Sequence, residues 1–432
     1  MKFLFITQYF PPEIGATQVR LASTIRELTR AGHQAEIVTA MPNYPEGRIL
    51  PAYRGRLYVR EEWEGVTVHR VWIHAAGGAG LGRILNYLSF TMASLFGILR
   101  CRRPDFVFVE SPPLFLTFPG YLASRWWGAR FIFNVADLWP DSVRSLGAIS
   151  DGWLLRSARR FEKWSYRRAT YVNAVTDHMR DALLREKGIS SEKLLFLPNG
   201  VDTDLFRPMP PDENLVQELR MEGKRIVLYI GSHGYVAGLE NVLEAAKALE
   251  SDPQIHFLFV GAGSDKPRLL EMARQMQLGN TTFLPPVPLD EVPRFLSIAS
   301  CCLITARNYT ICDGARPAKT FVIMAAGKPI ILAHNGEASR LVRRSGAGLV
   351  IPPEDSAALV AAIRTLLDDP ALCQRLGRNG RKYAEENFRW RDLVRDWLAQ
   401  LQHAQTEAGN PPRSTANRAQ AAEMEVRSPE AL

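Results

Sequence analysis

Two segments of the chain share an order of features that restricts the folds open to it. Residues 2–7 (KFLFIT) form an apolar run, followed by the loop QYFPPEIGATQ and a helical pattern. Residues 225–230 (RIVLYI) form another, followed by GSHGYVAG and a second helical pattern. A strand that leads through a glycine-containing loop into a helix is typical of Rossmann-like domains, where free N–H groups bind phosphate. The sequence therefore predicts an α/β protein with two Rossmann-like domains facing each other across a cleft.

The spacing of the apolar runs predicts where each domain lies. Helical patterns separate expected strands at 2–7, 34–39, 66–71, 105–110, 130–135 and 170–175, and at 225–230, 255–260, 281–284, 301–305, 328–332 and 348–351. Turn residues at 197–208 (LPNGVDTDLFRP) indicate a linker. We therefore expect one domain over 1–200, a second over 209–387, an amphipathic helix over 388–404 that packs back on the first, and a disordered tail over 405–432.

Positive charge is concentrated in the first half of the chain. Residues 1–200 contain 26 Lys and Arg against 17 Asp and Glu, whereas the remaining residues contain 27 against 28. A basic face attracts acidic lipid, nucleic acid or a phosphorylated substrate, although a solvated basic surface has the same composition. Residues 83–99 (RILNYLSFTMASLFGIL) are apolar and are followed by Arg100, Arg102 and Arg103. This pattern predicts either a helix in a membrane interface or a buried helix of the first domain.

Several classes of protein do not fit the sequence. The five cysteines form no CxxC pair, and the eight histidines show no HxxxH or HExxH spacing, so no metal site is predicted. Neither a GxSxG elbow nor a P-loop sequence is present, which argues against a hydrolase triad or a P-loop enzyme. No leader sequence and no apolar stretch of about 18 residues are evident, so we expect a cytoplasmic protein.

Three places along the chain carry residues suited to chemistry. Gly15 closes the first loop and allows a ligand to approach the backbone closely. Asp137 and Asp141 follow an expected strand and could orient a hydroxyl or cap the next helix. Lys319 and Thr320 begin a helical pattern, where they could meet an anionic oxygen or be ordinary surface residues.

The order of six segments resembles that of bacterial family 4 retaining glycosyltransferases of the GT-B fold. The segments are FITQYFPPEIGATQVRLA, ESPPLF, NVADLWPDS, LPNGVDTDLFRP, KTFVIMAAGKPII and GEASRLVRRSGAGLVIPPED. The resemblance runs from residue 2 to about residue 400. It is strongest to the branch associated with capsule, O-antigen and colanic acid sugars, which includes fucosamine transferases.

The resemblance implies roles for individual residues. Asn199 and Asp202 would belong to the hinge between the domains. The residues implied at the catalytic centre are Gly15, Asp137 and Lys319. The residues implied in donor binding are Gly15, Ser232, Val287, Arg316, Lys319, Thr320 and Glu337, with the backbone of Val287 at the nucleotide base.

At four positions the chain departs from its relatives. Many of them carry a basic residue where Ala136 stands, a lysine where Ala237 stands and a ribose-binding glutamate where Val322 stands. In those relatives the ribose-binding glutamate is paired with a second glutamate earlier in the chain, and Gly314 stands at that earlier position. The positive charge needed at a leaving diphosphate must then come from other residues. The candidates are Arg307, Arg316 and Lys319.

The resemblance implies a retaining transfer of a sugar from a nucleotide-diphosphate donor, expected to be UDP-linked. The implied acceptor is a hydroxyl of a polyprenyl-diphosphate-linked saccharide, at the inner face of the membrane, in cell-surface polysaccharide synthesis. No metal, cofactor or nucleic acid is expected. Two alternatives remain open: a non-hydrolysing sugar-nucleotide epimerase, and a non-catalytic GT-B partner subunit.

Overall fold

The first half of the chain forms an eight-stranded sheet with the order β3-β4-β2-β1-β5-β6-β7-β8. In this computed structural model residues 1–44, 46–77, 80–145 and 152–409 are described. All neighbouring strands are parallel except β3, which runs antiparallel to β4 at the sheet edge. The strands are β1 (Lys2–Ile6), β2 (Gln34–Ala40), β3 (Tyr58–Trp63), β4 (Val66–Val71), β5 (Phe106–Ser111), β6 (Arg130–Val135), β7 (Tyr171–Ala174) and β8 (Leu194–Phe196).

Helices cover both faces of this sheet, as a parallel sheet requires to bury its apolar strands. The sheet itself separates two apolar clusters, one around Val107 and Phe131 on one face and the other around Phe5 and Phe108 on the opposite face. The α-helices are α1 (Ala16–Arg30), α2 (Leu81–Ile98), α3 (Thr117–Trp127), α4 (Asp141–Ser145), α5 (Trp153–Arg168) and α6 (Asp177–Arg185). Short 3-10 turns are η1 (Pro51–Tyr53), η2 (Leu114–Leu116) and η3 (Ser191–Lys193).

The second half forms a separate six-stranded sheet that is parallel throughout, with the order β11-β10-β9-β12-β13-β14. This is the strand order of a doubly wound dinucleotide-binding domain, whose ligands lie where the order reverses, between the first and fourth strands. Those two strands are β9 (Arg225–Ile230) and β12 (Ala299–Thr305), which are paired. The others are β10 (Ile255–Val260), β11 (Thr281–Leu284), β13 (Ile330–Ala333) and β14 (Gly348–Ile351).

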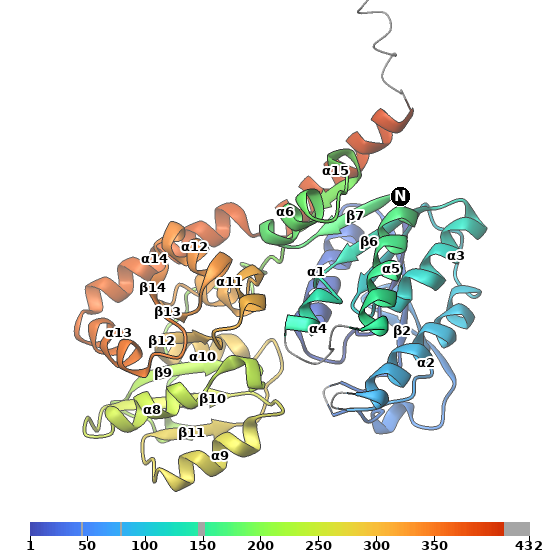
Figure 1. Cartoon of the computed structure of the whole chain (residues 1–432). Helices are drawn as coiled ribbons and strands as arrows, with labels where there is room; N and C mark the ends of the chain where they lie inside the picture. Colours follow the sequence, from blue (N-terminus) through green and yellow to red (C-terminus); the bar gives the residue numbers. More distant parts are fainter. Residues whose placement is uncertain (45, 78–79, 146–151, 410–432) are drawn as a thin grey trace, which may run out of the picture.

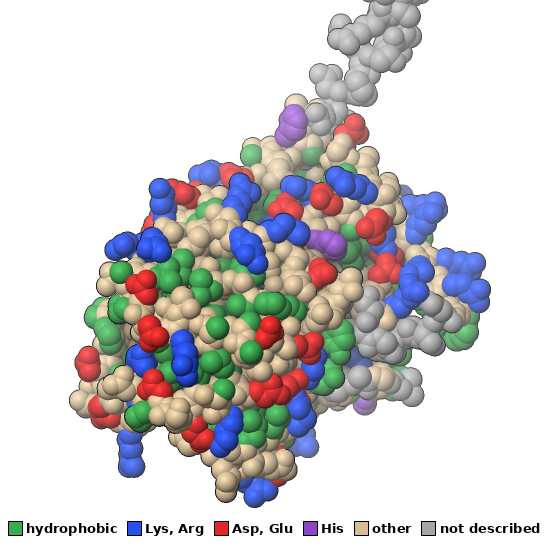
Figure 2. All heavy atoms as spheres, turned by 60° about the vertical axis from the view of Figure 1, so that its left-hand side comes forward, with side chains coloured by type: hydrophobic (Ala, Val, Ile, Leu, Met, Phe, Trp, Pro, Cys, Tyr) green, Lys and Arg blue, Asp and Glu red, His purple; other side chains and the backbone are tan. Residues whose placement is uncertain are grey.

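Helices again cover the second sheet on both sides (Figure 1). They are α7 (Glu213–Glu218), α8 (Glu240–Ala248), α9 (Lys266–Gln275), α10 (Val292–Ile298), α11 (Ala318–Ala325), α12 (Gly336–Ser345), α13 (Ser356–Asp368) and α14 (Pro370–Asn387), with the turns η4 (Tyr235–Ala237) and η5 (Thr310–Gly314). Acidic and basic side chains are intermixed over the second domain (Figure 2), as its near-even composition leads one to expect.

The chain crosses between the domains twice, and the two crossings touch. The Val201 N–H donates to the Phe388 carbonyl at 2.8 Å, and Val201 forms a parallel bridge with Arg389. After the second crossing, α15 (Trp390–Gly409) packs against α1 and β8 of the first domain. Trp397, fully buried, lies near the rings of Phe3 and Phe108. The C-terminal helix therefore belongs structurally to the first domain.

The structure differs from the sequence-based expectations at three elements. Strand β3 was not predicted, because its sequence YVREEW is half exposed at a sheet edge and lacks an apolar run. Strand β8 was not predicted either, because it has only three residues. Helix α15 continues to Gly409, past residue 404, where the helix was predicted to end. Residues 405–409 are therefore helical, which corrects the predicted start of the tail, and residues 410–432 lie outside the described part of the chain.

Candidate active site

Lys319 lies in the second domain at the place where a doubly wound sheet binds its ligand. It is in the first turn of α11 and its side chain reaches the loop after β9. Its ammonium nitrogen lies 3.7 Å from the centroid of the Tyr229 ring, and a Cβ added to Gly231 would lie 3.0 Å from it. No carboxylate pairs with Lys319 among the residues that the structure describes. Within this described part of the chain, the Lys319 ammonium therefore meets an aromatic face and no counter-ion.

Burial changes the acid–base behaviour of this lysine. Removal of the ammonium group from water disfavours its charged form and lowers the pKa of Lys319 to about 7. Among the residues that the structure describes, no side chain caps the N-terminus of α11, and the buried hydroxyl of Thr320 has no hydrogen-bond partner. A bound diphosphate would supply the missing anion for Lys319 and acceptors for these donors.

Arg316 is placed differently, because two carboxylates hold it. It forms ion pairs with Asp177 at the start of α6 and with Glu337 in the first turn of α12. The Glu337 carboxylate also accepts the backbone N–H groups of Asp177 (3.1 Å) and His178 (2.8 Å). Since α6 belongs to the first domain, these contacts form a latch between the domains. Arg316 and Glu337, both predicted to bind the donor, are thus mainly engaged with each other and with α6.

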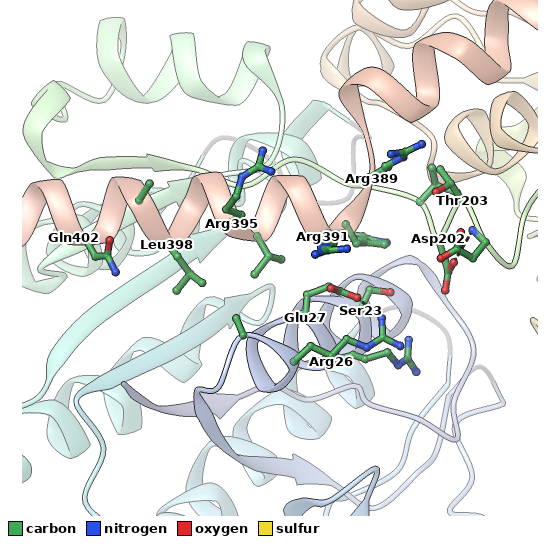
Figure 3. Close-up of a pocket in the computed structure, with 17 residues that line it drawn as sticks. Ser23, Arg26, Glu27, Asp202, Thr203, Arg389, Arg391, Arg395, Leu398 and Gln402 are labelled. Carbon is green, nitrogen blue, oxygen red and sulfur yellow. Dashed lines mark hydrogen bonds and ion pairs between the residues drawn. The ribbon is translucent and has the colours of Figure 1, made fainter.

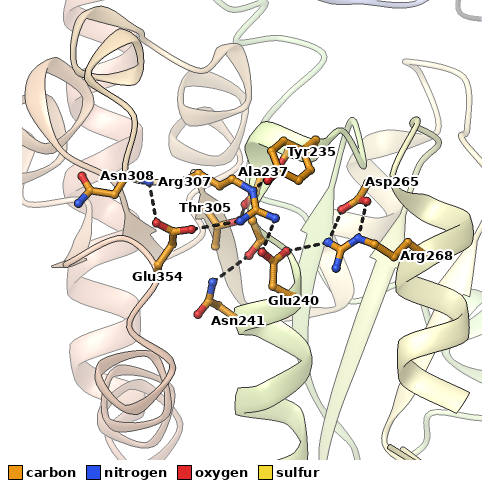
Figure 4. A network of polar contacts seen from close by, with 11 residues as sticks. Tyr235, Ala237, Glu240, Asn241, Asp265, Arg268, Thr305, Arg307, Asn308 and Glu354 are labelled. Carbon is orange, nitrogen blue, oxygen red and sulfur yellow. Dashed lines mark hydrogen bonds and ion pairs between the residues drawn. The ribbon is translucent and has the colours of Figure 1, made fainter. Parts of the chain in front are cut away.

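Arg307, the third candidate for the missing positive charge, is also neutralised (Figure 4). It forms ion pairs with Glu240 and, at 3.2 Å, with Glu354, and its Nε donates to the Tyr235 carbonyl at 2.9 Å. The carboxylate of Glu240 in turn pairs with Arg268. The network fixes the loop that carries Ala237 against β12. Of the three candidates, Lys319 is therefore the one whose charge is available to a ligand.

The loops around Lys319 fit tightly because glycines leave out a side chain. A Cβ on Gly261, whose φ is +146°, would lie 1.9 Å from the Gly231 carbonyl oxygen. Ser232 in this loop is exposed, and the Tyr229 hydroxyl donates to its carbonyl at 2.7 Å. Val287, in the loop after β11, is half-buried against the core of the domain. These positions line the C-terminal edge of the sheet around β9, as expected for a nucleotide site.

His233 was not predicted from the sequence and lies in the same loop. Its ring is fully buried near the rings of Tyr229 and Phe283, and neither ring nitrogen has a hydrogen-bond partner in the described part of the chain. Burial, with Lys266 and Lys319 nearby, lowers the pKa of His233 to about 4. The imidazole is thus neutral. The signal in the sequence was the histidine within GSHG, which alone does not distinguish it from a surface residue.

Gly15 precedes the first turn of α1 in the first domain. Its φ of 176° is extended, and no side chain of the described residues caps the helix, so within this part of the structure the first N–H groups of α1 have no side-chain acceptor. Glu13, two residues earlier, is buried and accepts the backbone N–H groups of Asn43 and Tyr44, each at 2.7 Å. Desolvation raises the pKa of Glu13 to about 7. These bonds fix the loop that carries Gly15.

Asp137 follows β6 and is largely buried. The Ser142 hydroxyl donates to its carboxylate at 2.9 Å, and burial raises the pKa of Asp137. Asp141, by contrast, begins α4 and pairs with Arg159 and Lys187. Helix α4 contacts η5 of the second domain. Among the described residues, however, no hydrogen bond or ion pair joins Asp137 or Gly15 to the second domain.

Beneath this edge of the first sheet, a row of buried polar groups connects the hinge to the C-terminal helix. The Arg20 guanidinium donates to Asn199 of the hinge (3.3 Å) and pairs with Glu110. The Asn134 side-chain amide donates to the Glu110 carboxylate at 2.7 Å, and the Asn173 amide donates to the Asn134 carbonyl oxygen at 2.6 Å. The indole N–H of Trp397 ends the row by donating to the Asn173 side-chain oxygen at 3.0 Å. This row could not be predicted from spacing, because its members are far apart along the chain.

A cavity of about 1030 Å³ lies elsewhere, behind the hinge (Figure 3). It is lined by α1, residues 201–204 and α15, and includes Asp202, which was predicted to belong to the hinge. None of the residues predicted to bind the donor lines it. The cavity is therefore a gap between elements that meet at the hinge, separate from the candidate donor site.

One group of residues has the chemistry of metal ligands, although none was predicted. Ligand atoms of Glu36, His69 and Cys101 lie within 4.8 Å of one another, away from Lys319. These groups have partners within the protein. A Glu36 carboxylate oxygen lies 3.6 Å from Nε2 of His69, and the Cys101 thiol donates to the Gly97 carbonyl at 3.4 Å. The expectation that the protein uses no metal stays a prediction.

Comparisons with known proteins decide the family. Residues 15–200 match the family described as glycosyl transferase 4-like domain, and residues 212–383 match glycosyl transferases group 1. The chain is 30% identical over 413 residues to a protein named as a colanic acid biosynthesis glycosyl transferase, WcaI, of Escherichia coli (strain K12). The match covers 92% of this chain and 99% of that one. This chain belongs to the family 4 glycosyltransferases of the GT-B fold.

Solved structures agree with the fold of this glycosyltransferase. A sucrose-phosphate synthase from Thermosynechococcus elongatus superposes with a TM-score of 0.73 at 19% identity, covering 94% of this chain and 99% of that one. HepE from Anabaena, in complex with UDP and glucose, superposes with a TM-score of 0.70 at 19% identity. The superposition covers 93% of this chain and 99% of that one. At such identities the likeness establishes the fold. The predicted family and GT-B fold are confirmed, whereas the roles of individual residues stay predictions.

Proposed function

We propose that this glycosyltransferase transfers a sugar from a UDP-linked donor, with retention of anomeric configuration, in cell-surface polysaccharide synthesis. Support for the donor comes from the HepE complex, and support for the pathway from the name of the WcaI relative. Both halves of the chain match glycosyltransferase families, which favours transfer over the epimerase alternative. The proposed acceptor is a hydroxyl of a polyprenyl-diphosphate-linked saccharide.

The observation that carries the proposal is the uncompensated Lys319. Negative charge grows on the leaving diphosphate in the transition state, so a preorganised cation there lowers the barrier. Arg307 and Arg316 are each held by two carboxylates, which leaves Lys319 and the N-terminus of α11 as the main stabilising groups. We propose that they replace a divalent metal. Ser232, Val287 and Thr320 would contact the rest of the nucleotide diphosphate.

The first domain would supply the acceptor side of the reaction. Asp137 is a candidate to orient the attacking hydroxyl, and burial raises the pKa of its carboxyl, which favours a proton on this group more than in water. Gly15 would let the donor and acceptor approach the free N–H groups of α1. Glu337 would act indirectly, by setting the position of α6 relative to the second domain.

The membrane face is proposed from two neighbouring helices, α2 and α3. Exposed apolar side chains recur every four residues along each, at Ile84, Leu88, Met92 and Phe96 and at Phe118, Leu122 and Trp126. Helix α5, which packs beside α3, exposes the basic residues Arg156, Arg160, Lys163, Arg167 and Arg168. Apolar stripes flanked by basic residues bind anionic bilayers. No helix among the described residues meets the length and hydropathy expected of a membrane span.

The donor and acceptor are tested in one assay. Purified enzyme is given a panel of UDP-sugars and vesicles that carry a polyprenyl-diphosphate saccharide, and the anomeric configuration of the new bond is read by NMR. The proposal expects transfer from one UDP-sugar with retention and without added metal in the presence of EDTA. An inverted product, or transfer that requires a divalent metal, would contradict it. Absence of any UDP binding would favour the non-catalytic partner subunit.

The membrane face is tested by sedimentation with anionic phosphatidylglycerol vesicles. Met92→Asp is expected to lower the bound fraction severalfold, because a charge must enter the interface. The matched control is Leu270→Asp on α9 of the second domain, also an exposed apolar residue, which should leave binding unchanged. Equal loss in both variants, or binding to neutral vesicles at the same level, would count against this face.

A further inference from the structure

Arg83 is a cation held between aromatic rings near the start of α2. Its guanidinium carbon lies 4.8 Å from the ring centroid of Tyr87 and 5.8 Å from that of Tyr9. Its Nε donates to the Tyr87 hydroxyl at 3.0 Å, and Tyr44 packs edge-on against Tyr9. These contacts fix the guanidinium without using all of its five N–H donors.

No carboxylate compensates Arg83 among the residues that the structure describes. The more deeply buried Arg20 and Arg70 both pair with a glutamate. The neighbours of Arg83 are tyrosines, and burial raises the pKa of Tyr9 well above its usual range, so its hydroxyl stays neutral. An arginine that is partly removed from water and lacks a counter-ion is suited to an anion from outside the chain.

The location of Arg83 restricts what that anion can be. On one side, Tyr9 belongs to the loop after β1 that continues to Gly15 and α1. On the other side, Ile84 begins the exposed apolar stripe of α2 that runs through Leu88 and Met92. The order along the surface is therefore the candidate catalytic edge, an unpaired guanidinium, and an apolar stripe. A lipid-linked saccharide has the same order: sugar, diphosphate, hydrocarbon.

We propose that Arg83 binds the diphosphate of the lipid-linked acceptor, with Tyr9 and Tyr87 holding its guanidinium in place and the isoprenoid chain lying along the α2 stripe. This inference rests on the proposed lipid-diphosphate acceptor and assigns it a binding residue. Arginine recognises phosphate oxygens through two parallel N–H bonds, so the site selects a diphosphate lipid over a neutral one. Such a contact would also set how far the saccharide reaches toward Asp137.

The test compares binding of farnesyl diphosphate and farnesol to the full-length enzyme in detergent, read by intrinsic tryptophan fluorescence. The wild type is expected to bind the diphosphate at least about tenfold more tightly than the alcohol. In Arg83→Ala that difference should disappear, and in Arg83→Lys it should be partly kept. UDP binding should stay within about twofold in all variants, which checks folding. Arg56→Ala, an exposed arginine of the same domain, is the matched control.

The outcomes distinguish the class of acceptor from the role of Arg83. If the wild type binds UDP but shows no preference for farnesyl diphosphate over farnesol, the lipid-diphosphate acceptor itself is wrong and the inference is overturned with it. If the wild type prefers the diphosphate and Arg83→Ala keeps the full preference, the acceptor class stands and the assignment of Arg83 is overturned. Loss of the preference in Arg56→Ala to the same degree would indicate a diffuse charge effect and would also overturn it.

Discussion

UDP should bind together with a proton because of Lys319. In the free protein the pKa of this lysine is lowered to about 7 by desolvation. A diphosphate beside it favours the charged form and should return the pKa toward the usual value of about 10.4. At pH 8.5 only about 3% of Lys319 is then protonated before binding and nearly all of it afterwards, so about one proton is taken up per UDP. Linkage also requires UDP affinity to fall by about tenfold per pH unit between about pH 8 and 10.

The assay is isothermal titration calorimetry of UDP at pH 8.5 in two buffers with different protonation enthalpies. The wild type should show a buffer-dependent heat that corresponds to about one proton. Lys319→Arg, which is charged at every pH tested, should show almost none and should bind with little pH dependence. Lys319→Met should also show none and should bind more weakly. Proton uptake that persists in Lys319→Met, or pH-independent binding in the wild type, would show that Lys319 is not the group that takes up the proton.

Three other outcomes follow from the same contacts. Between about pH 7 and 10 the folded protein holds fewer protons on Lys319 than the unfolded chain does, so the destabilisation caused by this buried cation is greatest below pH 7. Lys319→Met should therefore raise the melting temperature more at about pH 6 than at about pH 10, and an equal rise at both pH values would contradict this. Glu337→Gln should lower the free energy of unfolding in urea by about 1–3 kcal/mol, because Arg316 loses one of its two carboxylates and the N-terminus of α6 loses its charged acceptor. An unchanged free energy of unfolding would mean that the latch between the domains does not stabilise the protein. Trp397→Phe should cost about 1 kcal/mol through the lost bond to Asn173, whereas Trp397→Ala should cost about 3–5 kcal/mol; equal losses would show that packing does not dominate.

The sequence predicted the fold well where periodicity carries the signal. The buried strands β1, β9 and β10 are continuous apolar runs, so their positions could be read directly. It missed β3, where Glu61 pairs with Arg70 at an edge that water reaches and the charged residues hide the alternation. It also ended the last helix too early. There the polar residues around Thr406 suggested a tail, although local helix geometry continues to Gly409.

The candidate site was predictable only in part, because charge compensation depends on contacts between distant residues. Lys319 could be proposed from its place before an apolar helix. That Arg316 is held by Asp177, which lies 139 residues away and in the other domain, could not be foreseen from spacing. The same is true of Arg307 and Glu354. The sequence already favoured Lys319 over Arg316 and Arg307, and the fold supplies the physical reason through the charges that surround each of them.

A crystal structure of the enzyme with UDP is the most direct test of the proposed donor site. We expect the diphosphate to lie at the N-terminus of α11, with the Lys319 ammonium within about 3 Å of a phosphate oxygen. Arg307 should keep its pairs with Glu240 and Glu354. A complex in which the phosphates bind Arg307 or Arg316 instead, while Lys319 stays against Tyr229 without a phosphate contact, would contradict the central claim.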